Sequence, residues 1–145
     1  MKALIQRVKS AQVEVDKKCV ASIELGLLVF LGVEKTDDQV CADKLLDKIL
    51  HYRIFPDVEG KMNLGLTAVN GGLLLVSQFT LAANTQKGLR PSFSSAAQPE
   101  QAKKLYEYFT EQAIKNHSIV ESGIFAADMQ VSLVNDGPVT FLLDV

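Results

Sequence analysis

Apolar and polar residues alternate along residues 2–16, and this period-two pattern predicts an extended strand with a break near Ser10. The apolar face carries Ala3, Ile5, Ala11, Val13 and Val15. Arg7 falls on the same face. If it is buried, its guanidinium needs hydrogen-bond acceptors, because an unpaired charge in a low-dielectric interior is costly. The alternative is an arginine that extends along the sheet edge and keeps its charge in water.

Two further segments are apolar without alternation. Residues 25–33 and the shorter segment 73–76 each contain an unbroken run of aliphatic residues. This pattern is typical of strands that are covered on both faces. We therefore expect both segments in the centre of a sheet.

Two other segments show helical spacing. We expect the first helix to open at Thr36, because Gln39 follows at the spacing of a capping box, and to end at Pro56. The second begins at Pro99, a favourable first helical residue, and ends near Asn116. The apolar residues at helical spacing are Ala42, Leu45, Leu46, Ile49 and Tyr52 in the first helix, and Ala102, Leu105, Tyr106, Phe109 and Ala113 in the second.

The remaining segments predict turns, a long loop and two C-terminal strands. Residues 56–61 have turn composition, and residues 83–98 are rich in Ser, Asn, Gln, Gly and Pro, which predicts a loop of a length that is more often functional than idle. Strands over 129–134 and 139–143 flank a turn at 135–138, where Gly137-Pro138 has the composition of an ordinary hairpin turn. Together these elements predict one α/β domain over residues 1–145, with a mixed, largely antiparallel sheet and two long helices.

Composition narrows the class of protein. The chain has 145 residues, 48% of them hydrophobic and 22% charged, which excludes a disordered tail and a disulfide-stapled miniprotein. Its 15 Lys and Arg against 17 Asp and Glu give a net charge of −2. That charge argues against nonspecific binding along a nucleic-acid backbone, but it allows a protein that holds only one end of a nucleic acid. No apolar segment approaches the length of a membrane span, so we expect a cytoplasmic protein without membrane contact.

Cysteine and histidine spacing gives little support for a metal site. Cys19 and Cys41 form no CxxC pair, and neither His51 nor His117 lies at ligand spacing from them. We expect two reduced, buried cysteines and histidines in structural or solvent-facing roles. With no GxSxG, HExxH, P-loop or GxGxxG motif, the usual catalytic signatures are also missing.

The most suggestive polar cluster is Ser77-Gln78-Phe79-Thr80, directly after the buried segment 73–76. Side chains and free backbone N–H groups commonly converge on a ligand at the end of a central strand. The alternative is that Ser77 and Thr80 only cap a turn. The residues themselves leave both interpretations open.

With these segments taken together, the sequence closely resembles the D-aminoacyl-tRNA deacylase family. The resemblance covers nearly the whole chain in order. It is carried by residues 77–82 (SQFTLA), 87–93 (KGLRPSF), 123–129 (GIFAADM) and 135–140 (NDGPVT), together with 6–8 (QRV) and 62–64 (MNL).

The resemblance implies a homodimer that hydrolyses the ester between a D-amino acid and the terminal adenosine of tRNA, without a metal or cofactor. It implies that Ser77, Gln78, Phe79 and Thr80 are catalytic and line the pocket. Gly137-Pro138 would be a Gly-cisPro dipeptide that enters the active site of the other subunit and rejects L-amino acids, and Arg7 would orient it. The substrate and adenosine pocket would be formed by Phe79, Arg90, Pro91, Ser92, Phe93, Ala126 and Met129.

A mechanism follows from these expectations. Backbone N–H groups around Phe79 and Thr80 would stabilise the oxyanion. Thr80 would either attack the ester or position it while the ribose 2′-hydroxyl assists a water molecule; the absence of a base favours the second. We also expect Phe79 to pack on the adenine, and Lys87, Arg90 or Lys2 to lie near phosphates.

Other expectations concern assembly and the competing functions. Candidates for the subunit contact are Leu25, Leu28 and the C-terminal strands; the alternative is that each of them belongs to the hydrophobic core. The competing functions are a noncatalytic oligomeric small-ligand-binding protein, closed by the loop 83–98, and a general esterase that depends on Thr80.

Overall fold

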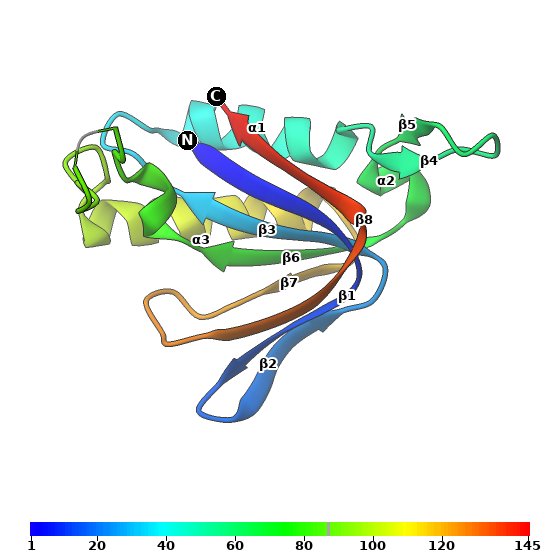
Figure 1. Ribbon diagram of the computed structural model, residues 1–145, viewed down its shortest axis with the longest axis horizontal. Coiled ribbons are helices and arrows are strands. Elements are labelled where there is room, and N and C mark those ends of the chain that lie inside the picture. The colour runs from blue at the N-terminus through cyan, green and yellow to red at the C-terminus, as the bar shows by residue number, and fades with distance from the viewer. Residues whose placement is uncertain (87) are drawn as a thin grey trace.

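The fold is a mixed sheet with its long helices packed on one face (Figure 1). The computed structural model describes residues 1–86 and 88–145. The main sheet consists of β1 (Lys2–Val15), β2 (Lys18–Ile23), β3 (Gly26–Gly32), β6 (Gly72–Ser77), β7 (Val120–Ser122) and β8 (Gln130–Asp144). Its order is β2-β1-β3-β6-β7. One edge of β1 pairs with β3 along its first half and with β2 along its second half. The opposite edge of β1 pairs with β8. The pairs of β1 are antiparallel, whereas β3–β6 and β6–β7 are parallel, which confirms the predicted mixed α/β class.

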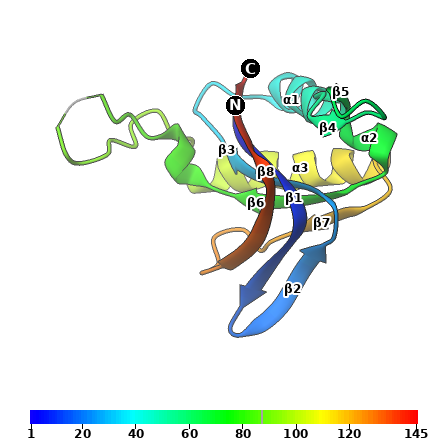
Figure 2. The same ribbon diagram turned by 45° about the vertical axis from the view of Figure 1, so that its right-hand side comes forward.

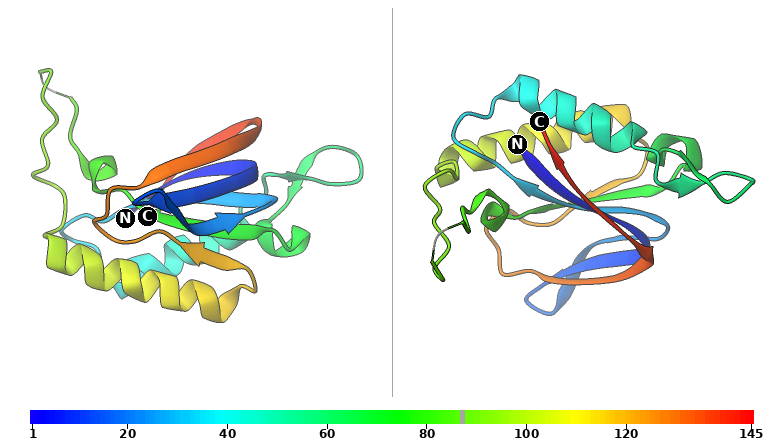
Figure 3. Two further views of the ribbon diagram at one scale, coloured as in Figure 1. Left: turned by 90° about the horizontal axis from the view of Figure 1, so that it is seen from below. Right: turned by 45° about the horizontal axis from the view of Figure 1, so that its top comes forward.

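The helices and short elements surround this sheet. The long helices α1 (Gln39–His51) and α3 (Pro99–Asn116) lie side by side on the same face (Figure 3). The short elements are β4 (Phe55–Pro56), β5 (Met62–Leu64), α2 (Leu66–Val69) and the 3-10 helix η1 (Phe79–Ala82). The sequence pattern did not predict β2, β4, β5, β7 or α2.

Strands β3 and β6 separate two hydrophobic cores, as their unbroken apolar sequences predicted. Leu27 and Leu73 belong to the core beneath the helices. Leu28 and Leu74, one residue further along each strand, belong to a second core formed with Val13 and other residues of the outer strands. Of the two leucines named as candidates for a subunit contact, Leu28 belongs to the core, because it has no exposed surface, whereas Leu25 is exposed.

Helix α1 starts and ends at residues other than those predicted. Asp38, not Thr36, is the N-cap: its side chain accepts a hydrogen bond from the Cys41 N–H at 2.9 Å, and this bond lowers the pKa of the Asp38 carboxyl. The helix ends at His51 rather than at Pro56, because Tyr52 already has an extended conformation. Helix α3 spans the predicted range, with Pro99 in its first turn.

The predicted break in β1 occurs next to Arg7. The register between β1 and β8 shifts twice between Gln6 and Ser10, so that Val8 is buried together with Ala3 and Ile5. The Arg7 side chain remains only 11% exposed. The arginine is therefore largely buried and requires partners, as expected for a buried guanidinium.

Residues 129–143 do not form the predicted hairpin. Residues 130–143 lie in one strand, β8, and both of its halves pair with β1 instead of with each other. The strand bends where residues 135–138 were expected to form a turn (Figure 1). The Gly137–Pro138 peptide bond is cis.

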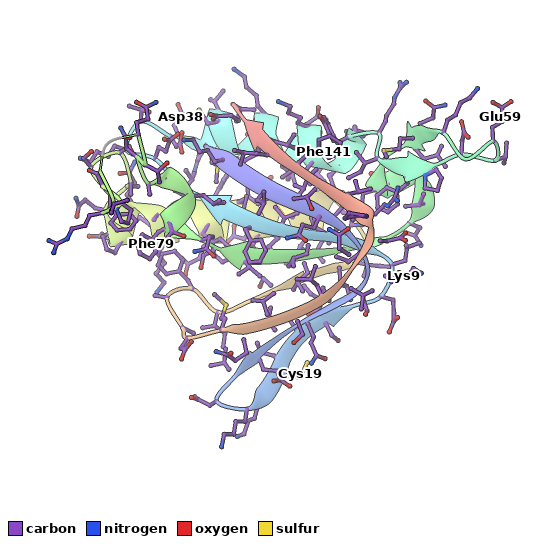
Figure 4. The ribbon with its side chains drawn as sticks, in the orientation of Figure 1. Lys9, Cys19, Asp38, Glu59, Phe79 and Phe141 are labelled. Atoms are coloured by element: carbon purple, nitrogen blue, oxygen red, sulfur yellow. The ribbon has the colours of Figure 1, made fainter. Side chains whose placement is uncertain are left out.

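The predictions for cysteines and histidines were partly wrong. Cys19 is exposed on β2 (Figure 4), because it lies at the start of that strand, next to the exposed turn from β1, and Cys41 is half-buried. His117 is buried with Nε2 2.6 Å from the Gly71 carbonyl oxygen, and His51 is exposed beside Asp47. No described helix is long and apolar enough to cross a membrane.

Candidate active site

A cavity of about 460 Å³ opens at the carboxyl ends of β3 and β6. Most of its surface is apolar, and α3 and the segment before β8 close its sides. Its lining consists of Phe30, Leu31, Val33, Val76, Ser77, Gln78, Phe79, Ala97, Pro99, Ala102, Tyr106, Phe125, Ala126, Ala127, Asp128, Met129 and Val131. The volume lies in the usual range for small-molecule sites.

The predicted polar cluster lies at the mouth of this cavity. Ser77 ends β6 and is half-buried, and η1 begins two residues later. Because η1 starts at Phe79, the N–H groups of Phe79 and Thr80 have no hydrogen-bond acceptor within the helix. The Gln78 side-chain amide donates to Thr80 Oγ1 at 2.5 Å. The cluster thus combines free backbone donors with a hydroxyl whose oxygen already accepts a hydrogen bond.

Phe79 forms the exposed rim of the cavity. Phe79 is 60% exposed (Figure 4). The centroid of its ring lies 5.0 Å from that of Phe93. The contact ties η1 to the loop 83–98. An exposed pair of aromatic rings can stack against a nucleic-acid base.

Tyr106, from α3, forms a polar point on the buried wall of the cavity. Its hydroxyl donates to the carbonyl oxygens of Leu75 at 3.0 Å and Gly123 at 3.4 Å. Burial raises the pKa of Tyr106 to about 12, so the phenol is protonated near neutral pH. The sequence pattern placed Tyr106 only on the apolar face of the helix, because helical spacing does not show which core residue reaches a cavity.

Four of the other predicted pocket residues come from the loop 83–98. Asn84 and Ser92 pair through their backbones, with N–O distances of 2.8 and 3.0 Å, and fold the loop back on itself (Figure 2). Phe93 reaches the rim through its contact with Phe79. Arg90, Pro91 and Ser92 are exposed and do not line the cavity.

Of the other predicted site residues, some line the cavity and some do not. Ala126 and Met129 lie in the cavity wall, beside Asp128, which is the one acidic residue of the described lining and was not predicted. Lys2 pairs with Glu34 at 3.4 Å. Lys87, which was also expected near phosphates, lies outside the described residues.

Gly137 and Pro138 do not line the cavity of their own chain. They are exposed at the bend of β8, where Arg7 holds the backbone: its Nε donates to the Asp136 carbonyl at 2.9 Å, and its Nη1 donates to the Ile54 carbonyl at 2.6 Å. The Asp136 carboxylate lies 3.6 Å from the same Nε. The partners of the buried guanidinium are therefore two backbone carbonyls and the Asp136 carboxylate.

The described residues contain no group of three or more His, Cys, Asp or Glu side chains placed to hold a metal ion. The reacting groups available at the cavity mouth are backbone N–H groups, hydroxyls and an amide. Such a site can bind a carbonyl and its developing negative charge.

Comparison with known proteins identifies the family. The family model described as D-Tyr-tRNA(Tyr) deacylase matches residues 4–144. The chain belongs to this family. It is an enzyme of the hydrolase class, as the resemblance implied.

Similar proteins cover the chain from end to end. It is 61% identical over 145 residues to the D-aminoacyl-tRNA deacylase of Cellvibrio japonicus (strain Ueda107), covering 100% of this chain and 99% of that protein. It is 63% identical over 145 residues to the protein of the same name from Haemophilus ducreyi (strain 35000HP / ATCC 700724), with 100% of each covered. Among solved structures, the c-Myc DNA unwinding element binding protein has a TM-score of 0.96 at 38% identity, covering 100% of this chain and 99% of that one.

Proposed function

We propose that this protein hydrolyses the ester bond of D-aminoacyl-tRNA and releases free D-amino acid and tRNA. The observation that carries the proposal is the junction of β6 and η1. There, within the described part of the chain, the N–H groups of Phe79 and Thr80 have no hydrogen-bond acceptor, and the Ser77–Thr80 cluster opens onto a largely apolar cavity. The names of the family and of the relatives support the substrate class. The 3′-terminal adenosine would enter the cavity, and Phe79 would pack against the base.

The reaction needs only modest assistance, because an aminoacyl ester is already activated. Water attacks the ester carbonyl carbon, negative charge develops on the carbonyl oxygen, and the bond to the ribose oxygen breaks, with a proton returning to that oxygen. The N–H groups of Phe79 and Thr80 would hold the charged oxygen, and one such donor can lower the barrier by about 2.7–4 kcal/mol.

Thr80 positions the ester in this proposal and does not attack it. Its oxygen accepts a hydrogen bond from Gln78, which makes that oxygen a poorer nucleophile, and no described basic group bonds to its hydroxyl. The hydroxyl proton remains available to the substrate. The ribose 2′-hydroxyl then assists the attacking water.

Chiral selection would come from exclusion by the main chain. A pocket that accepts many D-side chains cannot depend on attraction to any one of them, since contact with a methylene group discriminates by only about 1–3 kcal/mol. In a homodimer, exposed Gly137-Pro138 of one subunit would fill the space of an L-side chain in the partner's site. The open edge of β8, where Val134, Phe141 and Leu142 are exposed, offers a surface for that dimer.

The deciding experiment follows ester loss from matched D- and L-aminoacyl-tRNA and from glycyl-tRNA. We expect hydrolysis of the D-form and of glycyl-tRNA, because glycine has no side chain to exclude. A noncatalytic binder would hydrolyse none of them, and a general esterase would ignore chirality and accept small esters without RNA. Absence of glycyl-tRNA hydrolysis would reject the exclusion account.

The role of Thr80 is tested separately. Thr80→Ala should retain measurable deacylation, whereas D-aminoacyl-tRNA that ends in 2′-deoxyadenosine should lose far more. The opposite ranking would make Thr80 the nucleophile.

A further inference from the structure

The bend of β8 lacks the backbone pairing that holds the rest of the strand. Gln6 of β1 pairs with Thr140 and Val8 pairs with Asn135, so residues 136–139 of β8 have no backbone partner in β1. Pro138 also has no N–H to donate. Something other than the β-ladder must fix the main chain at Gly137 and Pro138.

The side chain of Asn135 supplies that missing constraint. Its Oδ1 accepts a hydrogen bond from the Val139 N–H at 2.7 Å, and its Nδ2 lies within 3.2 Å of the Val139 carbonyl oxygen. The same Nδ2 donates to Gln6 Oε1 at 3.0 Å and to Thr140 Oγ1 at 3.1 Å. One amide therefore closes the bend from residue 135 to residue 139 and fastens it to β1.

Arg7 and Asn135 hold opposite ends of the unpaired segment. Arg7 donates to the carbonyl of Asp136, before the Gly-Pro dipeptide, and Asn135 accepts from the N–H of Val139, after it. A Cβ on Gly137 would lie 2.7 Å from the Val139 nitrogen, so the backbone there is also closely packed. The dipeptide is thus fixed by side chains on both sides.

We infer that Asn135, braced by Gln6, is a positioning residue that sets the chiral specificity of the enzyme. The inference rests on the proposed function, in which Gly137 and Pro138 reject L-side chains by occupying fixed space. Exclusion of this kind depends on atoms held to a fraction of an ångström. Without the Asn135 amide, the bend relaxes and an L-side chain gains room, whereas the groups at Ser77–Thr80 are unchanged.

The test compares Asn135→Ala with wild type and with Ser132→Ala, a matched control at an exposed position of the same strand. The measured quantity is the ratio of kcat/KM for L- and D-aminoacyl-tRNA. We expect Asn135→Ala to raise the L/D ratio about tenfold or more while changing kcat/KM for the D-substrate less. Ser132→Ala should match wild type. An unchanged ratio in folded, active Asn135→Ala overturns the inference.

A second variant and a second measurement separate specificity from folding. Asn135→Asp keeps the size and the acceptor for the Val139 N–H but loses the amide donors; we expect a smaller rise in the L/D ratio, and it replaces Asn135→Ala if that variant does not fold. Hydrogen exchange of the Val139 amide should accelerate about tenfold in Asn135→Ala. Unchanged exchange also overturns the inference. If the wild-type protein leaves D-aminoacyl-tRNA intact, the proposed function is wrong instead. The exchange experiment would still show whether the Asn135 hydrogen bonds hold the β8 bend.

Discussion

Single side chains in this protein bind backbone groups and hold the main chain in place. Tyr106 joins the end of β6 to Gly123, Arg7 joins the β8 bend to Ile54, and Asp38 supplies the first hydrogen bond of α1. All three bind backbone groups. Removing one of these side chains should therefore displace the main chain. We expect the main effect on stability or on the geometry of the site, and a smaller effect through surface charge.

Replacing Tyr106 by Phe should lower the free energy of unfolding by about 1–3 kcal/mol near pH 8, because it removes the hydroxyl donor from the Gly123 carbonyl, whereas the Leu75 carbonyl still accepts from the Gly123 N–H. The folded-state pKa of about 12 lies above the usual 10.0, so the folded protein binds the phenolic proton more tightly. That stabilisation is complete below pH 10 and is lost as the pH rises toward 12. Urea unfolding should thus show the difference between wild type and variant shrinking by about 1 kcal/mol between pH 8 and 11. A constant difference would contradict the pKa assignment.

At the scale of residues, local patterns predicted positions rather than roles. The position of Ser77–Thr80 at the mouth of a cavity followed from polar residues after an aliphatic segment, and its catalytic role stays a prediction. An arginine on an apolar face implied hydrogen-bond partners, and Arg7 has them. The cap of α1 could not be chosen with certainty, since Thr36, Asp37 and Asp38 are all capping-type residues. Asp37 and Asp38 differ in what they bind: Asp37 accepts from the Glu34 N–H in the preceding turn, and Asp38 caps the helix.

At the scale of elements, the start of α1 gives a direct comparison. Asp38→Ala should lower the Tm by about 2–4 °C through loss of the cap, whereas Thr36→Ala should leave the Tm nearly unchanged. Because the hydrogen bond from Cys41 lowers the carboxyl pKa, the stabilisation by Asp38 is present above the usual pKa near 4 and is lost as the pH falls through the lower folded-state value. Calorimetry at pH 7 and at pH 3 checks both statements. Equal effects of the two substitutions would restore Thr36 as the cap.

The parallel pairing of β3 with β6 depends on two small residues. A Cβ added to Gly26 would lie 1.9 Å from the Gly72 carbonyl oxygen, which backbone cannot accommodate without separating the strands. We expect Gly26→Ala to destabilise the protein by about 3 kcal/mol or more in chemical denaturation. Gly60→Ala, in open space at φ 79°, should cost only about 1–2 kcal/mol.

The wrong hairpin at residues 129–143 shows why element pairing is hard to predict. Two apolar segments around Asn-Asp-Gly-Pro have the local composition of a hairpin. Their actual partner, β1, lies more than a hundred residues earlier in the chain, and nothing in the local pattern specifies it. The central strands β3 and β6 were easier to predict, because a strand that is buried on both faces has an unbroken apolar sequence.

At the scale of the whole molecule, the cavity is formed by segments distant in sequence: β3, β6, the start of α3 and residues 125–129. The hydrophobic periodicity of each segment does not show that these segments come together in the fold. Only the family resemblance linked Ala126 and Met129 to Ser77–Thr80 before the fold was known, and it did not single out Phe30, Tyr106 or Asp128.

The proposed homodimer contact along β8 can be tested by placing a charged residue in it. Leu142 is 60% exposed on that strand, and Leu142→Glu should convert a species of twice the 15.9 kDa chain mass to monomer in light scattering and reduce deacylation. The control is Val58→Glu, at a fully exposed position of the turn before β5, which should leave both unchanged. A wild-type monomer that is active, or a fully active monomeric Leu142→Glu variant, would reject a shared active site.

The free edge of β8 also has a consequence for the newly synthesised chain. A 15-residue strand with unpaired backbone groups on one side and exposed Val134, Phe141 and Leu142 is the kind of surface on which misassembled aggregates nucleate. Overexpression should therefore produce inclusion bodies more readily for Asn135→Ala, whose bend is loosened, than for Ser132→Ala. If the proposed role of the β8 bend in chiral selection holds, the same few residues of one strand would affect both the aggregation of the new chain and the accuracy of the enzyme.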